Sequence, residues 1–116
     1  AVLQNQTTTS ADQDSKLATT SDLCLTQWEA GRLDVAEKTA FTYLDAAKKK
    51  GEKHPETAKA LLLLAKIYKD MGKKEAAEKL MIKAIKIRKE VLGEKQMETL
   101  ESNFDLAKLY IDMQKY

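Results

Sequence analysis

The 116-residue sequence contains one cysteine, one histidine and one proline. Because Cys24 has no second cysteine to pair with, an internal disulfide is excluded. His54 lies far from Cys24 in the sequence, so the two supply neither an acid–base pair nor a zinc ligand set. A Gly-rich phosphate-binding loop is also absent from the sequence. The sequence therefore predicts a protein that is not an enzyme and that uses no cofactor or metal.

Long apolar runs and strong net charge are missing as well. No apolar stretch approaches the roughly 20 residues that a helix needs to cross a bilayer, so no membrane insertion is expected. The formal net charge is +2, which is too small to indicate a nucleic-acid partner. The segment 73–89 is rich in lysine, but Glu75 and Glu78 interrupt it and it contains no aromatic residue to stack on bases. It is expected to form a solvated outer face.

The residues that are abundant favour helices. Alanine, leucine, lysine and glutamate dominate the sequence, and all four are common in helices. Hydrophobic residues make up 43% and charged residues 33% of the chain. This balance fits a folded helical domain and excludes disorder for most of the length.

The sequence repeats itself at an offset of 42 residues. The matches are 51–57 (GEKHPET) with 93–99 (GEKQMET), 64–68 (LAKIY) with 106–110 (LAKLY) and, at an offset of 41, 31–38 with 72–79. Periods in this range are typical of solenoids, in which each unit buries its apolar face only against its neighbours.

Helical spacing of apolar residues, interrupted by turn residues, predicts five antiparallel helices. Their expected bounds are about 10–30, 33–50, 55–71, 74–92 and 97–113, and 1–9 are expected to be a mobile tail. The helices divide into repeat one (10–50), repeat two (54–92) and the first helix of repeat three (97–113). We expect either a fragment of a longer array or an array closed by a solitary final helix.

Repeat two resembles the tetratricopeptide repeat. The resemblance rests on Leu64-Ala65-x-x-Tyr68-x-x-x-Gly72-x-x-x-x-Ala77-x-x-x-Met81-x-x-Ala84. The flanking segments 92–94 (LGE) and 54–57 (HPET) are similar to the 42-residue variant found in kinesin light chains and many bacterial proteins. The resemblance covers about 15–116, although repeat one departs from it, with Gln27 in the place of Tyr68.

This resemblance implies an all-α fold, a right-handed α-solenoid of antiparallel helix pairs. It also implies a concave groove, lined mainly by the first helix of each pair, and a role as a non-catalytic interaction module.

Apolar candidates for the groove are Leu62 and Phe104, which the 42-residue offset relates. Leu62 stands in a run of four leucines (61–64), and a helix buried along one stripe is not expected to hide all four. The resemblance implies that Leu62 points into the groove. Two large apolar residues at one groove position predict a strip for a partner's side chains. The alternative is that both complete the packing between neighbouring first helices.

Charged candidates are Lys66 and Lys108, which the same offset relates and which lie one turn further along this face. Together with Lys59 and Lys69 they could attract an acidic peptide or a C-terminal carboxylate. The alternative is an ordinary solvated lysine face.

Trp28 aligns with Lys69 at an offset of 41, which places it on the rim of the groove. There it would anchor a ligand. The alternative is burial beneath the N-terminal tail.

The sequence thus predicts a module that binds a protein or peptide segment, with acidic residues if the lysines contact it. The predicted groove residues are Trp28, Leu62, Lys66, Lys69, Phe104 and Lys108. The alternative is a structural scaffold that forms homo-oligomers through the same apolar strip or through the unpaired last helix. The polar, Gln/Thr-rich start fits both a cytoplasmic protein and a matured exported bacterial protein, so the compartment is left open, with the cytoplasmic one slightly favoured.

Overall fold

Five α-helices account for the fold of the computed structural model, which describes residues 10–114. They are α1 (Ser10–Glu29), α2 (Leu33–Lys50), α3 (Pro55–Asp70), α4 (Lys74–Val91) and α5 (Met97–Met113). The predicted all-α architecture is confirmed, and each helix begins and ends within one residue of its expected bounds. Within 10–114 there is no strand, and no helix is long and apolar enough to span a bilayer. The predicted tail, 1–9, lies outside the described residues.

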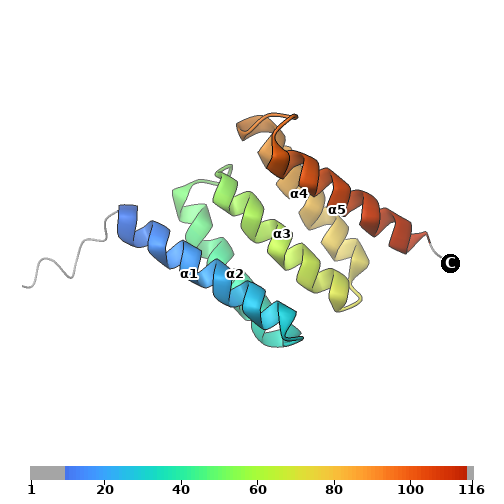
Figure 1. Cartoon of the computed structure of the whole chain (residues 1–116), viewed down its shortest axis with the longest axis horizontal. Helices are drawn as coiled ribbons and strands as arrows, with labels where there is room; N and C mark the ends of the chain where they lie inside the picture. Colours follow the sequence, from blue (N-terminus) through green and yellow to red (C-terminus); the bar gives the residue numbers. More distant parts are fainter. Residues whose placement is uncertain (1–9, 115–116) are drawn as a thin grey trace, which may run out of the picture.

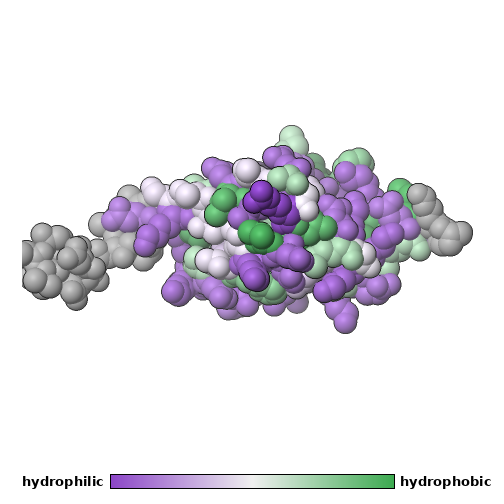
Figure 2. All heavy atoms as spheres, turned by 90° about the horizontal axis from the view of Figure 1, so that it is seen from below, coloured by the Kyte–Doolittle hydropathy of each residue, from purple (hydrophilic) through white to green (hydrophobic). Residues whose placement is uncertain are grey.

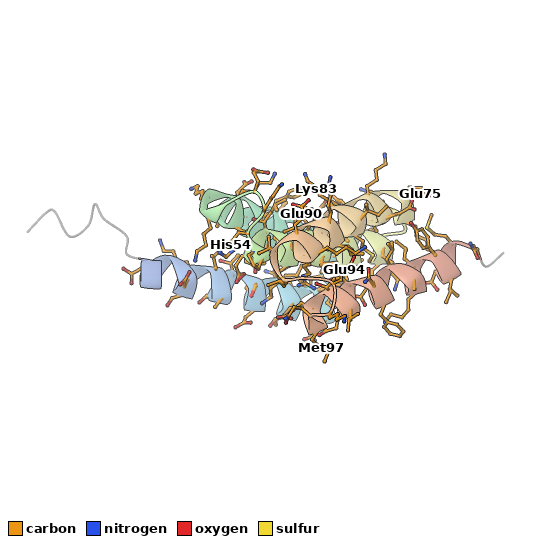
Figure 3. All side chains as sticks on the ribbon, turned by 90° about the horizontal axis from the view of Figure 1, so that it is seen from above. His54, Glu75, Lys83, Glu90, Glu94 and Met97 are labelled. Atoms are coloured by element: carbon orange, nitrogen blue, oxygen red, sulfur yellow. The ribbon has the colours of Figure 1, made fainter. Side chains whose placement is uncertain are left out.

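The helices stack in sequence order, and each contacts the next. In Figure 1, α1, α3 and α5 run roughly parallel to one another in front of α2 and α4. Seen from above in Figure 3, α1 and α5 lie along one side of the molecule and α2 and α4 along the other. The first helix of each pair therefore contributes to one face, and the second helices form the opposite face.

The loops before α3 and α5 each contain the same kind of side-chain hydrogen bond. The residues that form it match in the sequence repeat. Thr57 donates its hydroxyl to the Gly51 carbonyl at 2.7 Å, and Thr99 donates to the Gly93 carbonyl at 2.9 Å. Gly93 has a φ of 100°, which a residue with a side chain rarely adopts. Each bond ties the start of a first helix to the end of the preceding helix.

The core is centred on α3, which lies between α2 and α4 and also contacts α1. All four leucines of 61–64 are buried, which contradicts the expectation that one of them would remain accessible. The physical reason is that neighbours cover α3 on more than one side, so its buried surface is wider than a single stripe. On the face shown in Figure 2, hydrophilic residues predominate and apolar ones form small patches.

Leu62 is 6% exposed, so the expectation that it opens into the groove is wrong. Phe104, its equivalent on α5, is 64% exposed. The alternative, that both residues complete the packing between neighbouring first helices, is compatible with the burial of Leu62 and not with the exposure of Phe104. The two residues therefore do not form one accessible strip.

The α2–α3 contact contains a buried tyrosine. Tyr43 is fully buried and donates its hydroxyl to the carboxylate of Glu56. Burial, and after it the hydrogen bond with Glu56, raise the pKa of Tyr43 above its ordinary value near 10. The folded chain thus holds this proton more tightly than the unfolded chain does.

Leu62 and Phe104 are expected to differ sharply in their contribution to stability. Leu62→Ala leaves a cavity in the core and should lower the free energy of unfolding by about 2–4 kcal/mol. Phe104→Ala, at the equivalent but exposed position, should lower it by less than about 1 kcal/mol. Urea denaturation followed by circular dichroism measures both variants. Equal losses would show that Leu62 does not belong to the core.

Stability should fall as the pH rises above about 10, in part because of Tyr43. The unfolded chain releases the tyrosine proton in this range while the folded chain retains it, so alkali favours unfolding. Tyr43→Phe removes this titration, and its free energy of unfolding should decline less steeply between about pH 9 and 11. Urea denaturation at several pH values tests the difference. Parallel declines in the two proteins would contradict it.

Candidate functional site

A hollow of about 160 Å³ opens between α1, α3 and α5, and we call it the central hollow. Its lining residues are Trp28, Lys66, Lys69, Asp70, Met81, Asp105 and Lys108. Four of the six predicted groove residues, Trp28 and the three lysines, are among them. Side chains from α1, α3 and α5, together with the buried Met81 of α4, meet there because the helix pairs stack side by side.

Trp28 lies at the α1 side of the central hollow. Its indole Nε1 donates to Asp70 Oδ2 at 2.6 Å, and its ring packs partly against the core. Lys66 Nζ lies 5.9 Å from the centroid of the ring, within range of a cation–π interaction. Trp28 is therefore a partly exposed aromatic surface that α3 holds in place.

Aspartates accompany the lysines of the hollow. Lys66 Nζ lies 3.7 Å from Asp105 Oδ2, and Lys108 Nζ lies 3.8 Å from Asp105 Oδ1. Lys69 Nζ lies 3.7 Å from Asp112 Oδ2. The surface is therefore of mixed charge.

These ion pairs orient the lysines without sequestering them. Their separations are at the long end for a salt bridge, and the three lysine side chains are 32–52% exposed. Exposed pairs of this kind contribute roughly 0–1 kcal/mol each. A carboxylate from a ligand can thus replace Asp105 or Asp112 at small cost.

Sequence reasoning missed the acidic half of the site, which consists of Asp70, Asp105 and Asp112. For two of them the sequence does contain a signal of equivalent positions, since Asp70 and Asp112 are related by the 42-residue offset. Asp105 has no such signal, since the offset places it opposite Leu63. Only the packing of α5 beside α3 brings it to Lys66.

Phe104 borders the central hollow but does not line it. Lys108 Nζ lies 4.9 Å from the centroid of its ring, so a hollow residue and Phe104 contact each other. Leu62 is buried. Of the predicted apolar strip, Phe104 alone is accessible.

Two other groups of side chains bear on possible chemistry, the metal-ligating residue types and the Cys24 thiol. Within the described residues, no three His, Cys, Asp or Glu side chains gather closely enough to hold a metal ion. Cys24 is buried, its thiol donates to the Ala36 carbonyl at 3.5 Å, and burial raises the pKa of the thiol. A raised pKa opposes formation of the reactive thiolate.

The lysine-rich segment of α4 carries both positively and negatively charged side chains at the molecular surface. Lys83 and Lys86 line a shallow hollow together with Lys53 and Glu90, and Lys53 Nζ lies 3.0 Å from Glu90 Oε2. Figure 3 shows Lys83 on the side of the molecule opposite Met97 of α5. The segment thus lies away from the face that α1 and α5 border.

Comparisons with known proteins agree with the helical fold. A family model described as tetratricopeptide repeat matches residues 15–90, more than half of the chain. The crystal structure of BtubC (BKLC) from P. vanneervenii is similar in fold, with a TM-score of 0.80 and 24% sequence identity. The similarity covers 90% of this chain and 41% of that one, so the chain spans less than half the length of its structural relative. No curated protein gives a significant sequence match.

Removing the carboxylate of Asp70 should release Trp28. In Asp70→Ala the indole N–H loses its acceptor, so the fluorescence maximum and anisotropy of the single tryptophan should both change. Asp45→Ala, at an exposed position on α2, is the matched control and should leave the spectrum unaltered. Identical spectra for the two variants would contradict the placement of Trp28 against Asp70.

Proposed function

The chain belongs to the tetratricopeptide repeat family, whose members serve generally as protein–protein interaction modules, and we propose that it binds a segment of a partner protein in the central hollow. On this proposal the chain positions its partner and catalyses no reaction.

One observation carries the proposal: Trp28, Lys66, Lys69 and Lys108 come from three helices and converge on one hollow. Tryptophan is among the residues that most often dominate binding energy at protein interfaces, and the ammonium groups beside it can bind carboxylates of a partner. The lysines are partly exposed, and the tryptophan is fixed by Asp70 before a ligand arrives. Such preorganisation reduces the entropy lost on binding.

The chemistry of the hollow indicates what a partner segment would present. A carboxylate could bind Lys66 or Lys69 in place of the weakly held aspartates. An apolar side chain could pack on Trp28 or on the exposed ring of Phe104. Because Asp70, Asp105 and Asp112 balance the lysines, a segment that is only acidic is a poorer match. We therefore propose an extended segment that combines an acidic with an aromatic or aliphatic residue.

Self-association is the second candidate function. The buried position of Leu62 removes half of the apolar strip on which that proposal first depended. The exposed apolar side chains of α5 are the observation that still favours it. Sedimentation velocity of the full chain at several concentrations separates the two candidates, because a hollow free for a partner segment predicts a monomer and self-association predicts an oligomer.

Binding of short peptides provides the test of the hollow. The full chain is screened against an array of peptides about 12 residues long, and bound sequences should combine acidic with apolar residues. Trp28→Ala and the double variant Lys66→Gln/Lys108→Gln should each weaken binding of the selected peptides by about tenfold or more.

A matched control uses Lys86→Gln, which removes a lysine from the exposed surface of α4. This variant should bind the selected peptides as the unaltered chain does. If the hollow variants and Lys86→Gln bind equally well, the partner does not occupy the central hollow.

A further inference from the structure

A second hollow, of about 180 Å³, lies where α3 and α5 begin and α4 ends, and we call it the Arg88 hollow (Figure 1). Its lining residues are Pro55, Glu56, Lys59, Arg88, Leu92 and Glu98. None of these residues lines the central hollow. The two hollows are therefore separate sites.

Arg88 brings a partly buried guanidinium to this hollow without a carboxylate to pair with it. Within the described residues it donates only through Nη1, to the Glu98 carbonyl at 2.8 Å and to Ser102 Oγ at 2.6 Å. Its Nε is buried without a hydrogen-bond partner, and no described carboxylate forms a salt bridge with it. Burial lowers the pKa of Arg88, which reflects the cost of desolvating its charge. A bound anion would offset that cost.

The packing of the repeats does not require an arginine at this position. At the 41-residue offset that relates α2 to α4, Arg88 corresponds to Ala47, and at the 42-residue offset Ser102 corresponds to Ala60. Both alanines are fully buried. The junction between repeats one and two thus has alanines where the next junction has Arg88 and Ser102. The arginine is a departure from the repeat that packing alone does not explain.

From these observations we propose that the Arg88 hollow binds an oxyanion, a carboxylate or phosphate group, between Arg88 and Lys59. The planar guanidinium can pair two of its remaining N–H groups with two oxygens of such a ligand. Lys59 is exposed, and within the described residues no ion pair engages it. Its ammonium group is therefore available as the second cation of the site.

Two carboxylates line the same hollow and limit how tightly an anion binds. Glu56 accepts the hydroxyl of Tyr43, so α2 already engages this carboxylate. Glu98 is exposed and contacts Arg88 through its backbone carbonyl. Its side chain can therefore turn into solvent when an anion enters. Its charge still opposes the anion, and removing that charge should strengthen binding.

The position of the Arg88 hollow indicates which oxyanion reaches it. Lys59 and Lys66 lie seven residues apart on one side of α3, as Glu98 and Asp105 do on α5, so both hollows follow the same seam between these helices. Seven residues of helix rise about 10 Å, which an extended segment covers with about three residues. An acidic side chain of the partner segment is thus one source, and a free inorganic anion is the other. The first source rests on the proposed function.

Nuclear magnetic resonance of the arginine side chains tests the site without altering it. The chain contains two arginines, and Arg32, exposed between α1 and α2, is an internal control for Arg88. The full chain, isotope-labelled on arginine, is titrated with sodium phosphate and, separately, with sodium chloride at the same ionic strength. Phosphate should shift the Nε and Cζ signals of Arg88 to saturation and leave those of Arg32 in place. Arg88→Lys identifies which signals belong to Arg88.

Three exposed positions provide variants that leave the core intact. Lys59→Gln should weaken phosphate binding by about fivefold or more, because it removes the second cation. Lys86→Gln, on the exposed surface of α4, is the matched control and should bind phosphate as the unaltered chain does. Glu98→Gln keeps the carbonyl that Arg88 uses and should strengthen binding by about twofold or more.

Peptides selected at the central hollow distinguish the two sources. Each is compared in two forms, with glutamate or glutamine about three residues from the group that contacts Trp28. If the partner supplies the oxyanion, the glutamate form should bind about fivefold more tightly and shift the Arg88 signals, and Lys59→Gln should remove this advantage. If the oxyanion is free in solution, phosphate should shift Arg88 and the two forms should bind equally.

The inference is overturned if neither phosphate nor the glutamate peptides shift Arg88. Equal shifts of Arg88 and Arg32, or equal phosphate binding by Lys59→Gln and Lys86→Gln, would also overturn it, because the effect would then be one of ionic strength. Trp28 emission reports on the central hollow independently. Peptide binding there without a shift of Arg88 refutes this inference alone, and a phosphate shift without peptide binding refutes the proposed function alone.

Discussion

Packing of each helix against its neighbours in the row is the interaction on which the whole molecule depends. Within residues 10–114 neither a β-sheet nor a disulfide holds the helices together, and Cys24 is a free, buried thiol. The apolar area removed from water at each helix–helix contact is the main favourable contribution to stability. α3 buries apolar area against several neighbouring helices at once, which explains why four consecutive leucines are buried there.

The same dependence gives equivalent residues different properties at different places in the row. Leu62 and Phe104 occupy the same repeat position, yet the first is buried and the second is exposed. The difference lies in the neighbours: α3 lies between α2 and α4 and also contacts α1, whereas among the described helices α5 packs mainly against α4. A side chain in a solenoid thus acts as core or as surface according to its neighbours, and not according to its own identity.

This also explains how much could be predicted from sequence. The five helices follow from periodicity and turn glycines, which are local signals, and they are present with nearly the expected bounds. The resemblance at 64–84 led to the correct family. It also brought Trp28, Lys66, Lys69 and Lys108 forward as groove residues, and the structure places them around one hollow. The burial of Leu62 and the approach of Asp105 to Lys66 were not predictable, because both depend on how far each helix overlaps its neighbours.

The aspartates change what the hollow can select. A row of unpaired lysines would attract any acidic segment over a long range, with an affinity that falls steeply as salt is added. Asp105 and Asp112 balance the positive charge of the lysines that they contact. The long-range electrostatic attraction of the hollow for an acidic segment is therefore weak. Under the proposed function, a ligand would place its own carboxylate where an aspartate was, while its apolar group would contact Trp28 or Phe104. Discrimination between partners would then depend on the relative positions of these two groups, which the stacking of α1, α3 and α5 determines.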